Sequence, residues 1–239
     1  MLSLIEMFGF GPRGWGGLLL LGMGVTLAVT AAALLVGALL GALAAWAKLS
    51  RSRPMRVLGD LYTTVFRGVP ELLIIFLFYF GGSSVVSGIG HLFGREGFIG
   101  VPTFLAGALA VGVISGAYQA EVFRGAFRAV SPGELEAARA MGMPLTLRFR
   151  RIIVPQVLRF AIPGLGNVWQ LSLKDSALVS VTGLAELMRT AQIAAGSTRD
   201  YFEFYIAAGV LYLVLTALSN RVVDRAEARV GRSFRKRLA

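Results

Sequence analysis

The sequence contains no cysteine, a single histidine and few acidic residues. Among its 239 residues there are 13 Asp and Glu against 24 Lys and Arg, which gives a net charge of +11. The absence of cysteine excludes disulfides, thiolate metal sites and cysteine nucleophiles. His91 stands alone in a glycine-rich stretch, so we expect neither a catalytic nor a metal site. No GxxxxGK[ST] phosphate-binding loop occurs, so we expect no cofactor on this chain and no enzymatic activity of its own.

Apolar residues dominate the composition. They make up 56% of the chain, and the mean hydropathy is +0.70, which exceeds what the core of a water-soluble domain requires. A helix needs about 20 largely apolar residues to cross the roughly 30 Å hydrocarbon layer. Five stretches approach that length, so the sequence predicts an all-α integral membrane protein that forms a single domain, residues 1–239. The predicted spans are 16–47, 57–82, 101–123, 153–175 and 201–222.

The basic residues lie mainly on one side of the predicted membrane. They cluster between the first two spans, around the loop between spans three and four, and after Asn220. The positive-inside rule therefore places the N-terminus outside and the C-terminus in the cytoplasm. We expect the basic tail, residues 223–239, to lie near anionic lipid head groups rather than to bind nucleic acid.

The second span contains charged residues around a helix breaker. Gly68 and Pro70 separate Arg67 from Glu71, and proline lacks a backbone donor, so we expect the helix to restart there. A charge near the bilayer centre costs about 2.5–3.5 kcal/mol on insertion scales, so both charges need partners or a wet cavity. Two interpretations remain open, because the two charges, four residues apart, either pair with each other or hold a charged or zwitterionic ligand.

Two further spans carry polar groups close to their ends. Tyr118 and Glu121 share one helix face near the end of the third span, where Glu121 either pairs with Arg124 or lines a cavity.

The fourth span is interrupted by Pro163 and by glycines before its polar end. Broken helices at membrane depth often lie beside transport sites, so we expect that polar end to face a pathway or a gate. Its residues are Lys174, Asp175 and Ser176.

The loop between spans three and four, residues 131–152, has the pattern of a short helix. Ser131 is a candidate N-cap, proline follows at the first helical position, and Gly142 ends the helix predicted over 132–141. Ala137 and Ala138 expose little side chain, so another protein's surface could approach closely. A polar helix of this kind at the cytoplasmic edge is suited to docking on a soluble partner.

The residues of this loop resemble a known motif. Glu136, Ala137, Ala138, Gly142, Ile152 and Pro155, with Val154, follow the spacing EAA-x3-G-x9-I-x-[LV]-P. The pattern resembles the coupling loop of ATP-binding-cassette importer permeases. Four further segments resemble the polar amino-acid subfamily of these permeases, namely residues 67–71, 118–124, 163–167 and 173–180. With them, the resemblance covers nearly the whole chain.

The resemblance implies a five-helix type I importer permease with a cytoplasmic coupling helix. It implies a dimer of ATPases that bind ATP and Mg, a second permease that is a copy or a paralogue, and an external solute-binding protein. It also implies that the protein is located in the bacterial cytoplasmic membrane. Residues implied to couple to the ATPase are Glu136, Ala137, Ala138, Arg139, Gly142, Arg150 and Pro155.

The substrate is predicted from the intramembrane charges. Arg67 could bind a carboxylate, because its planar fork matches two oxygens. Glu71, Glu121 and Asp175 favour a cationic side chain, so we expect arginine, histidine, lysine or an opine. A glutamine or glutamate importer remains an alternative. A carrier driven by protons or sodium fits poorly, because five spans without a visible inverted repeat are few. A non-transporting anchor would not need the buried charges.

Overall fold

The structure is a computed structural model that describes residues 4–12, 14–94 and 97–235. Within these ranges every regular element is a helix, as predicted. In chain order the elements are α1 (Leu4–Phe8), α2 (Gly16–Leu49), α3 (Arg53–Gly68), α4 (Glu71–Phe76), η1 (Leu77–Gly81), α5 (Gly82–Leu92), α6 (Thr103–Arg128), α7 (Pro132–Ala140), α8 (Leu145–Arg148), η2 (Phe149–Ile153), α9 (Val154–Asp175), η3 (Ser176–Thr182), α10 (Leu187–Thr198) and α11 (Tyr201–Arg235).

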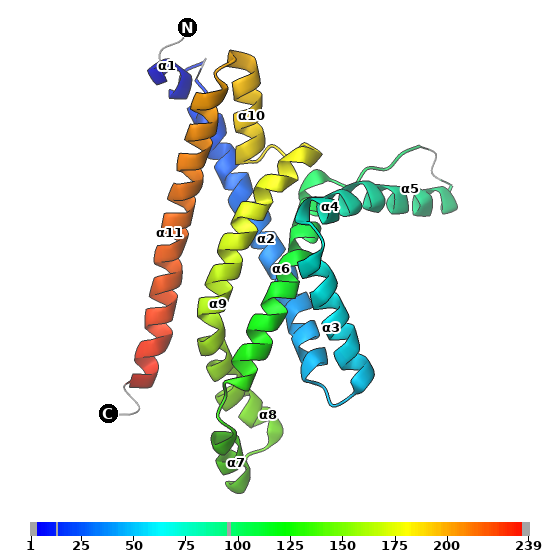
Figure 1. The fold of residues 1–239 in the computed structure, drawn as a ribbon, viewed down its shortest axis with the longest axis vertical. Helices are drawn as coiled ribbons and strands as arrows, with labels where there is room; N and C mark the ends of the chain where they lie inside the picture. The colour runs from blue at the N-terminus through cyan, green and yellow to red at the C-terminus, as the bar shows by residue number, and fades with distance from the viewer. Residues whose placement is uncertain (1–3, 13, 95–96, 236–239) are drawn as a thin grey trace.

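Five helical stretches in the described ranges are long and apolar enough to cross a membrane. They are Gly16–Leu49, Glu71–Leu92, Thr103–Arg128, Leu145–Thr182 and Tyr201–Val230. The first, fourth and fifth cover the corresponding predicted spans, and the third covers its span from Thr103 onward. Figure 1 shows α1 and α10 at one end of the bundle, and α7, α8 and the end of α11 at the other. The predicted fold class is therefore confirmed.

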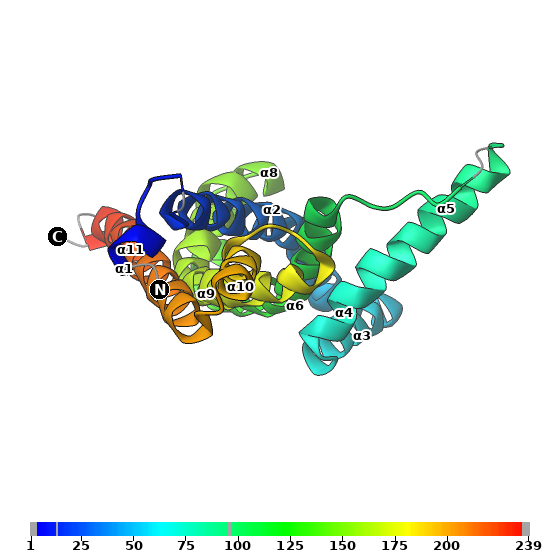
Figure 2. The same ribbon diagram turned by 90° about the horizontal axis from the view of Figure 1, so that it is seen from above.

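The second stretch differs from the predicted span, residues 57–82. Helix α3 ends at Gly68 and helix α4 begins at Glu71. Val69, between the two helices, has an extended backbone with φ −91° and ψ 138°. Extended backbone is expected before Pro70, whose ring excludes the helical conformation from the preceding residue. The helix restart is confirmed, but the chain also changes direction there. Figures 1 and 2 show α4 and α5 running away from the bundle rather than along it.

Helices α2 and α6 form the most extensive contact of the bundle. Glycines allow this approach, because a Cβ atom added at Gly41 would lie 2.9 Å from the carbonyl oxygen of Gly116 on α6. Gly37, one turn earlier, faces Ser115 and Gln119, and a Cβ atom there would meet them at least as closely as the one at Gly41 meets Gly116. The spacing Gly37-x-x-x-Gly41 is therefore a packing face of the small-xxx-small kind.

Two clusters of buried apolar side chains complete the packing. The first joins α2, α4, α6 and η3 through Val29, Ile75, Ile114 and Val179. The second joins α1, α2, α10 and α11 around Phe204, which is fully buried. The first cluster lies where α4 leaves the bundle, so it holds the break between α3 and α4 in place.

Candidate functional site

Arg67 and Tyr118, both predicted pathway residues, are in contact. The guanidinium carbon of Arg67 stands 5.2 Å from the centroid of the Tyr118 ring. The aromatic face attracts the cation and leaves the edge donors of the guanidinium available. Arg67 itself is exposed, at the last turn of α3. This arrangement presents a positive charge at the point where the second helix breaks.

Acidic groups face the same break from two elements. Glu71 is the first residue of α4, and α4 packs against η3. The element η3 begins directly after Asp175, the last residue of α9. The charges of Glu71 and Asp175 act on each other, and Lys174 acts on Asp175 with the opposite sign. Lys174 is exposed, whereas Ser176 is fully buried and donates its hydroxyl to the Leu173 carbonyl at 2.7 Å. The structure therefore brings most of the predicted pathway residues around one junction.

The structure does not pair Arg67 with Glu71. The ion pairs of the described residues do not include these two. Side chains four residues apart meet only on a continuous helix, and the chain is extended at Val69. The break therefore separates the two charges and leaves both near the junction.

Glu121 lies in a separate ionic network. Its carboxylate accepts a hydrogen bond from Lys48 on α2 and forms an ion pair of 2.6 Å with Arg124. Lys48, whose side chain is 9% exposed, also pairs with Asp60 at 3.0 Å and donates to Thr63 at 2.8 Å. The network joins α2, α3 and α6. The predicted Glu121–Arg124 pair is present, and Lys48 is a member that the sequence did not indicate.

The predicted coupling helix is α7. It runs from Pro132 to Ala140, and Gly142 follows with φ 71°, the left-handed conformation that ends many helices. The amide of Met143 donates to the Ala138 carbonyl at 3.0 Å, which closes this terminus. Ser131 occupies the N-cap but makes no side-chain cap bond. The helix boundaries agree with the prediction to within one residue.

The motif residues of α7 and its flank divide into outward and inward positions. Glu136, Ala137 and Arg139 are exposed, whereas Ala138 is 7% exposed and packs inward. The small size of Ala138 therefore serves packing within this chain, while the exposed face carries both charges. Arg150 in η2 and Pro155 at the start of α9 are also exposed.

A side-chain bond connects α7 to α9. The Gln156 amide, at the start of α9, donates to the carboxylate of Glu134 in the first turn of α7. Gln156 is 8% exposed, so this charge-assisted bond is largely shielded from water. The sequence did not indicate this pair, because the partners come from different helices and neither belongs to the motif.

A buried carboxylate at the opposite end of the bundle was also missed. Glu186 caps α10 and is 0% exposed. It accepts hydrogen bonds from Thr26 of α2 at 3.1 Å, Tyr212 of α11 at 2.9 Å and the Arg189 amide at 2.7 Å. Burial raises the pKa of Glu186 above its ordinary value, although these bonds oppose the shift. A single acid within an apolar segment was the available sequence signal.

The outer segment around this acid has two faces. Leu187, Ala191 and Ala195 are buried against the bundle, while Ile193 and Gly196 are exposed. The amphipathic character expected for residues 183–195 is present. Its exposed face lies at the end of the bundle opposite α7 (Figure 1).

Comparisons with known proteins give one consistent family. Residues 33–232 match the family described as binding-protein-dependent transport system inner membrane component. The chain is 52% identical over 235 residues to the octopine transport system permease protein OccQ of Rhizobium meliloti, covering 98% of this chain and 99% of that protein. It is 40% identical over 210 residues to the histidine/lysine/arginine/ornithine permease HisQ of Escherichia coli, covering 88% and 92%.

A solved structure shows the same fold. The crystal structure of an amino acid ABC transporter with histidines superposes with a TM-score of 0.75 at 36% identity, covering 90% of this chain and 95% of that chain.

Proposed function

Since the chain belongs to the family of binding-protein-dependent transport system inner membrane components, we propose that it carries a cationic amino acid or an opine into the bacterial cell. It forms the transmembrane pathway, and an ATPase on a separate chain supplies the energy. The observation that carries this proposal is α7, an exposed motif helix at one end of the bundle that is bonded to α9.

Helix α7 is suited to receive movement from the ATPase. Its exposed residues Glu136, Ala137 and Arg139 form the docking face, and Gly142 and Arg150 lie in its flanks. ATP and Mg bind on the ATPase, whose closure moves α7. The bond between Glu134 and Gln156 passes this movement to α9. The far end of α9 carries Lys174 and Asp175, so the movement reaches the junction where α3 breaks.

The charges at that junction support a cationic, zwitterionic substrate. Arg67, held over the Tyr118 ring, binds the substrate carboxylate. Glu71 and Asp175 supply negative charge for its cationic groups. Glu121 contributes less of this charge, because Lys48 and Arg124 already compensate it. The relatives named for octopine and for histidine, lysine, arginine and ornithine support the same class.

The transporter contains more than this chain. We place a second permease, a copy or a paralogue, beside the exposed apolar side chains of α5, such as Leu92 at 85% exposure. An ATPase dimer lies below α7, and a solute-binding protein docks at the α10 end. The basic residues around α7 and along the end of α11 support a cytoplasmic location for these elements and an outside location for the N-terminus.

Reconstitution with the ATPase and the binding protein tests the function. Octopine, arginine, histidine, lysine, glutamine and glutamate are titrated separately while ATP hydrolysis and uptake into proteoliposomes are measured. We expect octopine or a cationic amino acid to stimulate both activities. Stimulation by glutamine or glutamate alone would move the substrate to the polar uncharged or acidic class. Uptake that proceeds without ATP would refute the proposal that this chain belongs to an ATP-driven importer.

Charge reversal on α7 tests the coupling face. Glu136→Lys is expected to weaken ATPase association about tenfold or more, as a central interface residue does. Glu227→Lys, an exposed charge reversal on α11, is the matched control and should leave association unchanged. Equal association of both variants with the ATPase would show that α7 is not the docking face.

Removal of the Arg67 side chain tests the pathway. A hydrogen bond to a charged group is worth about 1.5–3 kcal/mol, so Arg67→Ala should raise the half-saturating substrate concentration about tenfold or more. Arg67→Lys keeps the charge without the planar fork and should be affected less. Uptake is measured with saturating binding protein. Unchanged transport by Arg67→Ala would exclude the carboxylate role.

A further inference from the structure

A chain of buried polar groups leads from Asp175, at the pathway junction, to Glu186, the N-cap of α10. Ser176 follows Asp175 directly and is fully buried. The Tyr212 hydroxyl of α11 donates to the Glu186 carboxylate at 2.9 Å and also interacts with the Ser176 hydroxyl. Thr26 of α2, again fully buried, donates to the same carboxylate at 3.1 Å. These side chains therefore join α2, η3, α10 and α11 next to the junction.

Apolar packing would suffice to hold these helices together. The cluster around Phe204 already packs α10 against α2 and α11. A buried polar group recovers its lost hydration only while its partner stays bonded, and such bonds are strong in the low dielectric of a protein interior. The polar chain therefore fixes where α10 stands relative to η3, in addition to stabilising their contact.

Helix α10 is bounded by a sharp turn on each side. Gly183 lies before it with φ 91°, and Arg199 follows it with φ 67°. The backbone route from α10 to η3 thus passes through an exposed glycine, the residue with the most conformational freedom. The helix itself packs closely on α2, since a Cβ atom added at Gly22 would lie 2.8 Å from the Thr190 hydroxyl oxygen. A displacement of α10 therefore reaches η3 through the side-chain bonds rather than through Gly183.

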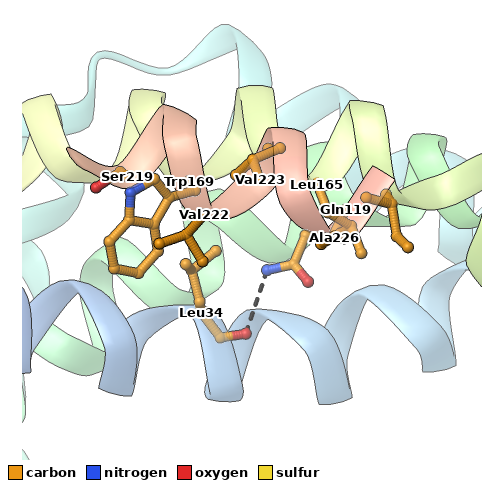
Figure 3. Close-up of a pocket in the computed structure, with 10 residues that line it drawn as sticks. Leu34, Gln119, Leu165, Trp169, Ser219, Val222, Val223 and Ala226 are labelled. Carbon is orange, nitrogen blue, oxygen red and sulfur yellow. Dashed lines mark hydrogen bonds between the residues drawn. The ribbon is translucent and has the colours of Figure 1, made fainter. Parts of the chain in front are cut away.

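Farther along α11, a cavity of about 510 Å³ lies between α2, α6, α9 and α11 (Figure 3). In its wall the Gln119 amide donates to the Leu34 carbonyl at 3.3 Å, the dashed line in Figure 3. Ser219 and Val222 of α11 also line it, and Ser219 is about two turns beyond Tyr212. The polar attachment of α11 at Tyr212 therefore lies on the α10 side of this cavity, whereas the Ser219 hydroxyl belongs to the cavity wall.

We propose that Glu186 and Tyr212 are positioning residues that connect docking of the solute-binding protein at α10 to the pathway junction. The proposal rests on the function proposed above. A binding protein that shifts α10 moves the Glu186 carboxylate, and the bonded Tyr212 and Ser176 hydroxyls pass this shift to Asp175 at the end of α9. Coupling between two sites is reciprocal, so movement of α9 driven by the ATPase displaces α10 in return. Glu186 acts through Asp175 and does not reach the substrate, because it is fully buried.

Nucleotide-dependent binding tests this connection. The complete transporter is placed in nanodiscs, and the binding protein, loaded with octopine or with arginine, is titrated with and without a non-hydrolysable ATP analogue. We expect the analogue to change the affinity for the binding protein in the wild type. Tyr212→Phe removes only the hydroxyl and should reduce this change by about fivefold or more, the factor that one hydrogen bond is worth. The affinity without nucleotide should stay unchanged, because the exposed face of α10 is kept.

Matched variants separate the polar chain from other hydroxyl groups. Tyr205→Phe alters a tyrosine of α11 that is 41% exposed, and Ser219→Ala alters the cavity wall in Figure 3. Both should keep the nucleotide response of the wild type. Ser176→Ala should reproduce the effect of Tyr212→Phe, and the double variant should add nothing further, as for two members of one chain. Thermal unfolding midpoints confirm that each variant is folded.

Distinct results would overturn the proposal. If the wild type and Tyr212→Phe respond equally to the analogue, or neither responds, the polar chain does not connect α10 with α9. If Tyr212→Phe weakens binding already without nucleotide, Tyr212 shapes the docking face instead. If the effects of Tyr212→Phe and Ser176→Ala add, the two act by separate routes. A wild-type transporter that does not bind the binding protein at all would refute the proposed function, and the connection with it.

Discussion

At the scale of single residues, Lys48 is the centre of the ionic network that joins three helices. It contacts Glu121, Asp60 and Thr63 while its side chain is 9% exposed. A shielded charge that loses its partner is more costly than the pair itself is stabilising. The ion pairs of Lys48 therefore hold α2, α3 and α6 in fixed relative positions, because each charge needs its partner on another helix.

Replacement of Lys48 should destabilise the bundle. Lys48→Met keeps the length of the side chain but leaves Glu121 with Arg124 alone, so we expect a loss of about 1–3 kcal/mol. The thermal unfolding midpoint in detergent should fall by roughly 3–10 °C. Asp60→Asn removes a partner that is 63% exposed and should cost less than about 1 kcal/mol. Equal effects of the two substitutions would argue against a central role for Lys48.

The buried Glu186 carboxyl predicts a pH dependence of stability. Burial raises its pKa in the folded protein, so folding favours the protonated form. This stability is fully present below the unfolded pKa of about 4.3, and it is lost as the pH rises through the raised folded pKa. Unfolding midpoints across this range should therefore fall more steeply with pH for the wild type than for Glu186→Gln. Parallel profiles would show that Glu186 does not titrate in the fold.

At the scale of elements, close helix packing depends on the glycines of α2. Gly41→Ala would place a methyl group 2.9 Å from the Gly116 carbonyl oxygen. Overpacking of this kind costs about 1–3 kcal/mol. Gly24 on the same helix faces open space, so Gly24→Ala should be neutral or stabilise by up to about 1 kcal/mol through helix propensity. Thermal unfolding of both variants checks the contrast, and a stable Gly41→Ala protein would contradict it.

The same scale separates what the sequence predicted from what it did not. The ends of α7 were predictable, because proline at its start and Gly142 after its end act locally. The break at Pro70 was predictable for the same reason, but the new direction of α4 was not, since packing on η3 sets it. The Lys48–Glu121 pair and the hydrogen bonds of Glu186 join segments far apart in the chain. Local patterns carry no information on such partners.

At the scale of the whole molecule, the two functional regions lie at different levels of the bundle. Helix α7 lies at one end, and the junction of Arg67, Glu71 and Asp175 lies where α3 and α9 finish their course from that end (Figure 1). Helix α9 connects the two levels as one continuous element from Val154 to Asp175. Pro163 lies inside this helix, so the interruption expected there is wrong. A rigid connection of this kind transmits displacement only if α7 is attached to it.

The bond between Glu134 and Gln156 is that attachment, so its removal should uncouple the transporter. Gln156→Leu leaves the docking face of α7 intact, and we expect normal ATPase association. The bond is charge-assisted and worth about 1.5–3 kcal/mol, so its loss should lower the amount of substrate imported per ATP by about threefold or more. Asn167→Leu, which replaces an exposed amide on the same helix, is the control. Weakened ATPase association would instead assign the bond to folding of α7, and an unchanged transport ratio would remove it from the coupling path.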